Sequence, residues 1–255
     1  MAVAATDPLV VLRNSAARLR ALVEPLTGAQ LRARAYPSEW SIADVLSHLG
    51  SGGTIMLANL DASVSGEAVP DGFVQPIWDE WNAKPPEAIA ADSLAVDARL
   101  GERAEAFTAE ERARVKLAFG PVSLDFLHAI RMRLNEHALH TWDVEVVLDP
   151  TATVAPDAAA LVVDNLELIV RFVGKPTGVV HDVHVHTTGS ERDFTLALGA
   201  EGVSLTPAMG ATEPDLELPA EAFVRLVYGR LDADHTPPVR GSADLDELRR
   251  AFPGI

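Results

Sequence analysis

The spacing of apolar residues changes near residue 150, and this change constrains the fold more than any other feature of the chain. Up to about residue 148, apolar residues such as Val10, Leu12, Ala16 and Leu19 recur with the period of an amphipathic helix. Residues 149–156, DPTATVAP, form a short polar hinge, and strand-like alternation follows it. We therefore predict an α+β protein with one domain over residues 1–150 and a second over residues 151–255.

Four long helices are expected in the first domain. They are predicted over residues 10–23, 41–49, 86–107 and 122–148. Ser41 and Asp44 have the spacing of a capping box, and Gly120-Pro121 is a break that suits the start of the fourth helix. Consecutive long helices favour a four-helix bundle.

The second domain reads as a small α+β domain. We expect helices at its start and end and short strands between them, over residues 157–172 (helix), 179–187, 193–198, 203–205 and 216–218 (strands), and 220–228 and 243–252 (helices).

Charge excludes several classes of partner. The formal net charge of −16 argues against a phosphate backbone or an anionic membrane, because both require a basic surface. The chain has no run of 18 apolar residues and no basic region leading into an apolar one at its N-terminus, so we expect a cytoplasmic protein. Small molecules are the expected partners.

The absence of cysteine limits the available chemistry. The chain can form neither a disulfide nor a thiolate nucleophile, and any zinc must be bound by His, Asp or Glu. A thiol that takes part in a reaction here must therefore arrive with a ligand.

Three side chains are candidates for a metal site. Glu136 and His140 are four residues apart in a predicted helix and share one face of it, and His48 lies in another predicted helix of the bundle. Two histidines and one carboxylate suit zinc with its fourth position open. The alternative is a solvated helix face with an ion pair between Arg133 and Glu136. Asp143 either orients His140 or is an ordinary surface acid.

A second group of histidines has a simpler interpretation. His184 and His186 share one face of a predicted strand, opposite Val183 and Val185, and no clear third ligand is nearby. A polar sheet face explains this pattern better than a metal site. We expect Trp40 and the other tryptophans to serve in packing or as pocket walls.

Two segments make the chain resemble a known family. Residues 37–49, PSEWSIADVLSHL, and residues 131–144, RMRLNEHALHTWDV, are similar in order and spacing to the mycothiol-dependent maleylpyruvate isomerase family. The resemblance covers nearly the whole chain. It implies a DinB-like four-helix bundle followed by a small sterol-carrier-like α+β domain.

The resemblance also implies cofactors and site residues. A divalent metal, usually zinc, is expected on His48, Glu136 and His140, with the thiol of mycothiol at the open position. An arginine of the C-terminal domain is also implicated in catalysis in this family. Arg230 best matches its setting, and Arg225 is a rival; a surface arginine that closes a helix is the simpler reading of either.

The resemblance leaves the reaction open. Isomerisation and transfer of the thiol to a small electrophile begin at the same site. The opposing class is a non-catalytic protein whose bundle and sterol-carrier-like domain bind a small ligand or regulate a partner, and it requires no metal.

Overall fold

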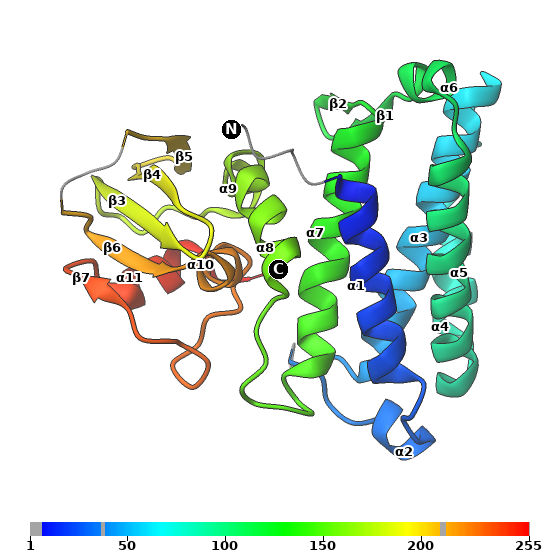
Figure 1. Cartoon of the computed structure of the whole chain (residues 1–255), viewed down its shortest axis with the longest axis horizontal. Coiled ribbons are helices and arrows are strands. Elements are labelled where there is room, and N and C mark those ends of the chain that lie inside the picture. The colour runs from blue at the N-terminus through cyan, green and yellow to red at the C-terminus, as the bar shows by residue number, and fades with distance from the viewer. Residues whose placement is uncertain (1–6, 37–38, 210–212, 255) are drawn as a thin grey trace. The chain divides into compact units, whose positions relative to one another are not determined.

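The structure is a computed structural model that describes residues 7–36, 39–209 and 213–254. The chain divides into two compact units, Met1–Ala152 and Thr153–Ile255. Within the described residues, the first unit is helical apart from one short hairpin, and the second contains a sheet (Figure 1), which confirms the predicted α+β class. Pro37 and Ser38, which open the first family-like segment, lie outside the described residues.

Four long helices form a bundle in the described part of the first unit, as Figure 1 shows. They are α1 (Pro8–Val23), α3 (Ile42–Ser65), α5 (Pro86–Ala106) and α7 (Phe126–Glu145). α1 packs against α5 and α7, and α3 packs against the same two helices. The helices that carry the predicted ligands, α3 and α7, are therefore neighbours. Fully buried aliphatic side chains fill the centre, among them Leu19, Val45, Leu46, Leu49, Ile130 and Leu134.

The start of α3 is fixed by the capping box expected from the sequence. Oδ2 of Asp44 accepts a hydrogen bond from the backbone N–H of Ser41 over 2.8 Å, and Oγ of Ser41 accepts one from the backbone N–H of Asp44 over 3.2 Å. Two N–H groups at the helix start are thus satisfied. α3 continues past His48 through a glycine-rich stretch, residues 50–53, and ends at Gly66, whose φ is 77°.

The fourth long helix begins later than predicted. Residues 122–124 form β2 (Val122–Leu124), which pairs with β1 (Leu117–Phe119) in an antiparallel hairpin. Gly120 makes the turn with φ of 55°. Asp125 then caps α7, because its Oδ1 accepts a hydrogen bond from the backbone N–H of His128 over 3.0 Å.

Three short helices complete the described part of the first unit: α2 (Gly28–Leu31), α4 (Val74–Asn82) and α6 (Ala109–Arg114). The sequence did not predict them. α4 packs on α3 through Trp81, whose ring lies where a side chain of Gly50 would begin. None of the helices in the described residues is long and apolar enough to cross a membrane.

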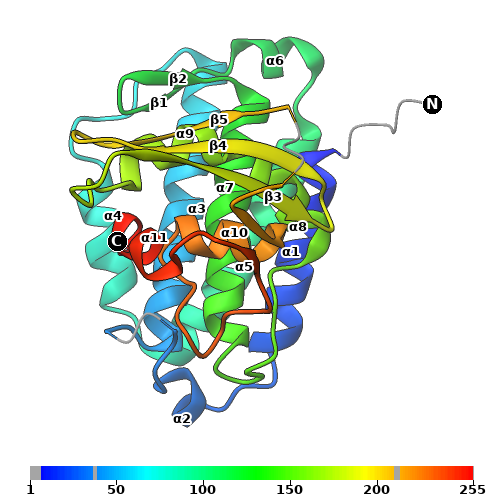
Figure 2. The ribbon, with the colours of Figure 1, turned by 90° about the vertical axis from the view of Figure 1, so that its left-hand side faces the viewer.

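The second unit combines helices with a mixed sheet (Figure 2). Its described helices are α8 (Pro156–Val162), the 3₁₀ turn η1 (Val163–Asn165), α9 (Leu166–Val173), α10 (Ala220–Val227) and α11 (Leu245–Ala251). Its described strands are β3 (His181–Thr188), β4 (Arg192–Leu198), β5 (Val203–Pro207), β6 (Leu216–Pro219) and β7 (Arg240–Gly241).

The described strands lie in the order β5-β4-β3-β6-β7. β3 and β6 are parallel, and the other neighbouring pairs are antiparallel. α9 packs on β5, and α10 packs on β3 and β6. Val183 and Val185 are buried while His184 is exposed, so the alternation predicted for this strand is confirmed. The helix expected over residues 157–172 is instead divided by the 3₁₀ turn.

Candidate metal centre

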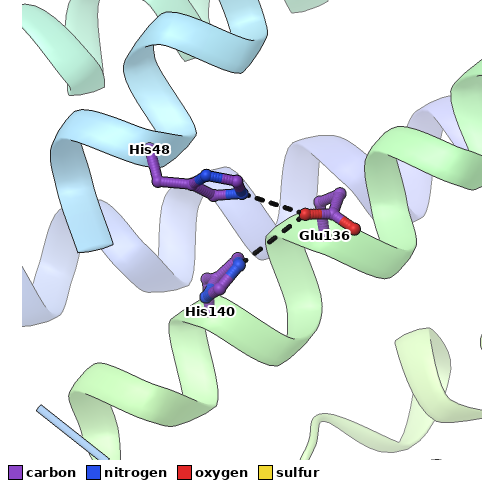
Figure 3. Close-up of side chains that lie close together, drawn as sticks. All are labelled: His48, Glu136 and His140. Carbon is purple, nitrogen blue, oxygen red and sulfur yellow. Dashed lines mark hydrogen bonds and ion pairs between the residues drawn. The ribbon is translucent and has the colours of Figure 1, made fainter. Parts of the chain in front are cut away.

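His48 of α3 meets Glu136 and His140 of α7 (Figure 3). Nε2 of His48 lies 3.1 Å from Oε2 of Glu136, and Nε2 of His140 lies 3.6 Å from the same oxygen. The side chains of His48 and Glu136 are about two-fifths exposed, at 41% and 42%, whereas that of His140 is 9% exposed. The three predicted ligands therefore form one cluster that is open to solvent on one side.

The spacing of the donor atoms fits one small divalent cation. One ligand atom from each residue lies within 4.8 Å of the other two. Zinc binds nitrogen and oxygen ligands at about 2.0–2.2 Å, so the edges of a tetrahedral site are roughly 3.4 Å long. The distances of 3.1 and 3.6 Å lie on either side of that length. Small shifts of the side chains would suffice to bind an ion.

Asp143 fixes the orientation of His140. Its Oδ2 lies 2.8 Å from Nδ1 of His140, and its side chain is fully buried. A carboxylate accepts hydrogen bonds, so Nδ1 carries a proton. Nε2 faces the cluster and presents a lone pair to an ion once its own proton has left. Asp143 thus orients a candidate ligand and is not a surface acid.

The carboxyl group of Glu136 is held in its ionised form. Desolvation raises its pKa, but hydrogen bonds from His140 and His48 and the charges of the two imidazoles outweigh this effect and place the pKa far below its usual value of 4.5. An ionised carboxylate is the form that binds a cation.

Trp40 forms an aromatic wall beside the two histidines. Its ring is stacked on that of His140, with the centroids 5.9 Å apart, and lies 5.4 Å from that of His48. The backbone fixes this position, because Ala35 N donates to the carbonyl oxygen of Trp40 and Ile42 N donates to that of Ala33. Its place directly before the cap of α3 was the only signal in the sequence.

Arg133 does not pair with Glu136, so the interpretation of this helix face as solvated is wrong. Its side chain is 5% exposed, and its Nη2 donates a hydrogen bond to Oδ1 of Asp97 over 2.9 Å. His137, which the sequence analysis did not single out, binds the other oxygen of Asp97 over 3.0 Å. Periodicity placed Arg133 on a polar stripe without revealing that this stripe faces the interior.

The histidines of β3 are each paired with a carboxylate. Nδ1 of His184 lies 3.2 Å from Asp215, and Nδ1 of His186 lies 2.9 Å from Asp193. The hydrogen bond from His186 to Asp193 raises the pKa of His186 despite partial desolvation. Nε2 of His186 also lies 3.0 Å from Glu191, but among the described residues the ligand atoms of these side chains do not lie close enough together to hold one metal ion.

The two candidate arginines of the second unit have different surroundings. Arg225 is 2% exposed; its Nε and Nη2 donate to the carboxylate of Glu221 over 2.8 and 2.9 Å. Arg230 follows the end of α10, is partly exposed, and donates from Nη1 to the carbonyl oxygen of Tyr228 over 2.9 Å. Arg225 is thus buried and paired with Glu221, whereas Arg230 is partly exposed.

Two solved structures share this fold. One is described as the crystal structure of the mycothiol-dependent maleylpyruvate isomerase; it is 13% identical, the match covers 91% of this chain and 93% of that one, and the TM-score is 0.64. The other is a histidine-to-alanine mutant of a protein so described, 12% identical over 88% of each chain, also with a TM-score of 0.64. No curated protein matches the chain.

The family itself is identified by the first unit. The model of the mycothiol maleylpyruvate isomerase N-terminal domain matches residues 12–145, which is more than half of the 255 residues. The matched region contains His48, Glu136 and His140. The chain therefore belongs to the mycothiol maleylpyruvate isomerase N-terminal domain family.

Proposed function

We propose that this protein is a metal-dependent enzyme that uses the thiol of mycothiol to attack a small electrophile. The observation that carries the proposal is the cluster of His48, Glu136 and His140 in a bundle whose chain has no cysteine. Membership of the family and similarity in fold to mycothiol-dependent maleylpyruvate isomerase support mycothiol as the thiol.

The donor set suits zinc. Two neutral imidazoles and one carboxylate are ligands that zinc accepts, and they leave one position of a tetrahedral ion open. A divalent ion held there would lower the pKa of a thiol that enters the open position, so that the thiolate is present near neutral pH. The exposed sides of His48 and Glu136 provide access for such a thiol.

The charge and orientation of these ligands are set by the residues themselves and by their neighbours. Glu136 supplies the negative charge of the set, because its pKa is far below neutral pH. Asp143 holds a proton on Nδ1 of His140 and thereby directs Nε2 toward the cluster. Trp40 covers a face of the His140 ring and keeps water from that side.

We infer that Arg230 binds an anionic or polarised group of the electrophile. A metal with two neutral histidines and one carboxylate has a net positive charge that a thiolate largely cancels, so a substrate carboxylate needs a cation of its own. A guanidinium provides a planar, bidentate one. Arg225 is 2% exposed and Arg230 is partly exposed, which favours Arg230 over Arg225 for this role.

Isomerisation and S-transfer differ in what becomes of the thiol. An isomerase returns it unchanged, whereas a transferase leaves it bonded to the product. The experiment is therefore to purify the protein without chelator, measure its metal content, and incubate it with mycothiol and either maleylpyruvate or a general thiol-reactive electrophile. Free thiol and product are followed together.

We expect about one divalent ion per chain and a turnover that requires both the ion and mycothiol. Constant free thiol during conversion identifies an isomerase, and loss of one thiol per product identifies a transferase. Equal turnover without mycothiol would contradict the proposal and favour water as the nucleophile. A protein with neither metal nor turnover would belong to the non-catalytic class.

A further inference from the structure

A chain of buried polar groups connects all four long helices of the bundle. Nη2 of Arg133 donates to the carbonyl oxygen of Leu49 on α3 over 2.8 Å and to Asp97 on α5 over 2.9 Å. Asp97 also accepts a hydrogen bond from Nε2 of His137 on α7. Nδ1 of His137 lies 2.8 Å from Oγ of Ser15 on α1. All four side chains of this network are buried.

One end of the network lies beside the candidate ligands. Arg133 is one helical turn before Glu136 on α7, and Leu49 directly follows His48 on α3. The hydrogen bond from Arg133 to Leu49 therefore joins the two helices within a few residues of the point at which their ligands meet. Within the metal centre, His48 is joined to α7 by its hydrogen bond with Glu136.

Two glycines of α3 make room for the guanidinium. A Cβ atom at Gly52 would lie 3.3 Å from Nη1 of Arg133, and one at Gly53 would lie 3.2 Å from Nη2. Both distances are shorter than ordinary van der Waals contacts. The glycine-rich stretch after His48 therefore allows Arg133 to lie directly against the backbone of α3.

Stability alone does not explain an arginine at this position. A buried ion pair can often be replaced by apolar side chains without loss of stability. Nε of Arg133 is buried and has no hydrogen-bond partner, which lowers the stability of the fold further. The alternative is that Arg133 is retained because its hydrogen bonds fix one arrangement of the helices.

A metal site needs such an arrangement. Ligand distances are tolerated only within about 0.2 Å, whereas successive residues of a helix are about 1.5 Å apart along its axis. A slight slide of α3 along α7 would therefore separate His48 from Glu136 and His140. α3 packs more extensively on α5 than on α7, so the direct contact between α3 and α7 is the smaller of the two.

We propose that Arg133 is a positioning residue that sets the register of α3 against α7 and so brings His48 to the metal centre. It is not one of the three candidate ligands. It acts through the carbonyl oxygen of Leu49, and its guanidinium is held by Asp97, which His137 also binds. This inference rests on the proposed metal centre.

The test is zinc affinity, measured by competition with a chelator, together with thermal unfolding of the metal-free protein. Arg133→Met should weaken zinc binding by roughly 10–100-fold, the usual effect of losing a residue that supports a ligand. Ser15→Ala removes a hydrogen bond at the opposite end of the same network. It should lower the unfolding temperature but leave zinc affinity unchanged, which separates positioning from stability.

A second pair of variants tests the proposal without removing a charge. Gly52→Ala places a methyl group against Nη1 of Arg133, whereas Gly101→Ala places one on α5 where no atom lies within 4 Å. Alanine is the better helix former at both positions, so both variants should fold. We expect Gly52→Ala to weaken zinc binding several-fold and Gly101→Ala to leave it unchanged.

The outcomes separate this inference from the function on which it rests. A wild-type protein that does not bind zinc overturns the proposed metal centre itself. A wild-type protein that binds zinc, with Arg133→Met binding it equally tightly, overturns the role of Arg133 alone. If Arg133→Met does not fold, Gly52→Ala decides the question instead. Zinc affinity in Gly52→Ala equal to that of the wild type would also overturn the role of Arg133.

Discussion

Asp143 and His140 are joined by a hydrogen bond of 2.8 Å in which the carboxylate oxygen accepts from Nδ1 of the ring. The bond lies inside the bundle, one turn from the exposed side of the candidate metal centre. It determines which nitrogen of His140 has a free lone pair.

Replacement of Asp143 by Asn should weaken metal binding by about 10–100-fold, because the neutral amide holds the ring in the required tautomer less firmly. Isothermal titration with zinc measures the effect. Asp232→Asn is the matched control, since Asp232 makes the same type of 2.8 Å bond to Nδ1 of His235 in the other unit. Equal losses in the two variants would contradict an orienting role for Asp143.

Removal of any one ligand should have a larger effect. His48→Ala, Glu136→Ala and His140→Ala should each reduce zinc affinity by more than the roughly 10–100-fold expected for a supporting residue, and each should abolish mycothiol-dependent turnover. Far-UV circular dichroism of the metal-free variants should match that of the wild type. His184→Ala, which removes an exposed histidine of β3, should change none of these properties. Retained binding in His140→Ala would remove the metal assignment.

The buried network should make the metal-free protein sensitive to acid. Burial raises the pKa of Asp97, but the charges and hydrogen bonds of His137 and Arg133 on α7 lower it from 3.8 to about 2. The group therefore stabilises the fold above pH 4, and this contribution is lost as the pH falls from about 4 to 2. Its size is about 2 kcal/mol.

Urea unfolding of the wild type and of Asp97→Asn across this pH range measures that contribution. The variant should be less stable at neutral pH, because Arg133 then lacks its counter-charge. The difference between the two proteins should shrink as the pH approaches 2. Parallel curves would mean that Asp97 does not stay ionised in the fold.

Arg230 and Arg225 should respond differently to substitution. Arg230→Ala should lower turnover while metal content stays unchanged, and Arg230→Lys should recover little of it, because an ammonium does not reproduce a bidentate guanidinium. Arg225→Met should instead destabilise the protein by about 3–5 kcal/mol, because it leaves the carboxylate of Glu221, whose side chain is only 12% exposed, without its partner. Full activity in Arg230→Ala would show that this arginine was misassigned.

The periodicity of the sequence was sufficient to predict the long helices and the three clustered side chains. Glu136 and His140 share a helix face by their spacing, and His48 joined them because it lies in another predicted helix of the same bundle. The hairpin at residues 117–124 was missed because a short apolar segment such as 122–124 is compatible with a helix or a strand.

The hydrogen-bond partners of Arg133 could not be predicted from the periodicity of the sequence. Asp97 lies 36 residues away in the sequence, and the carbonyl oxygen of Leu49 lies 84 residues away. Which residues meet across a bundle depends on the rotation and register of each helix, and the pattern of one helix does not contain that information. The same limit applied to Trp40, whose position depends on a backbone turn before α3.

His48 and Glu136 are 88 residues apart in the sequence. An ion shared by them would close a loop of that length, and by chain-entropy estimates a permanent covalent link across such a loop is worth roughly 4–5 kcal/mol. The ion would therefore act as a cross-link between distant parts of a chain that has no cysteine for a disulfide. Unlike a disulfide, this cross-link needs no oxidising compartment and can be removed by a chelator. The resistance of the bundle to proteolysis should therefore follow the concentration of free zinc.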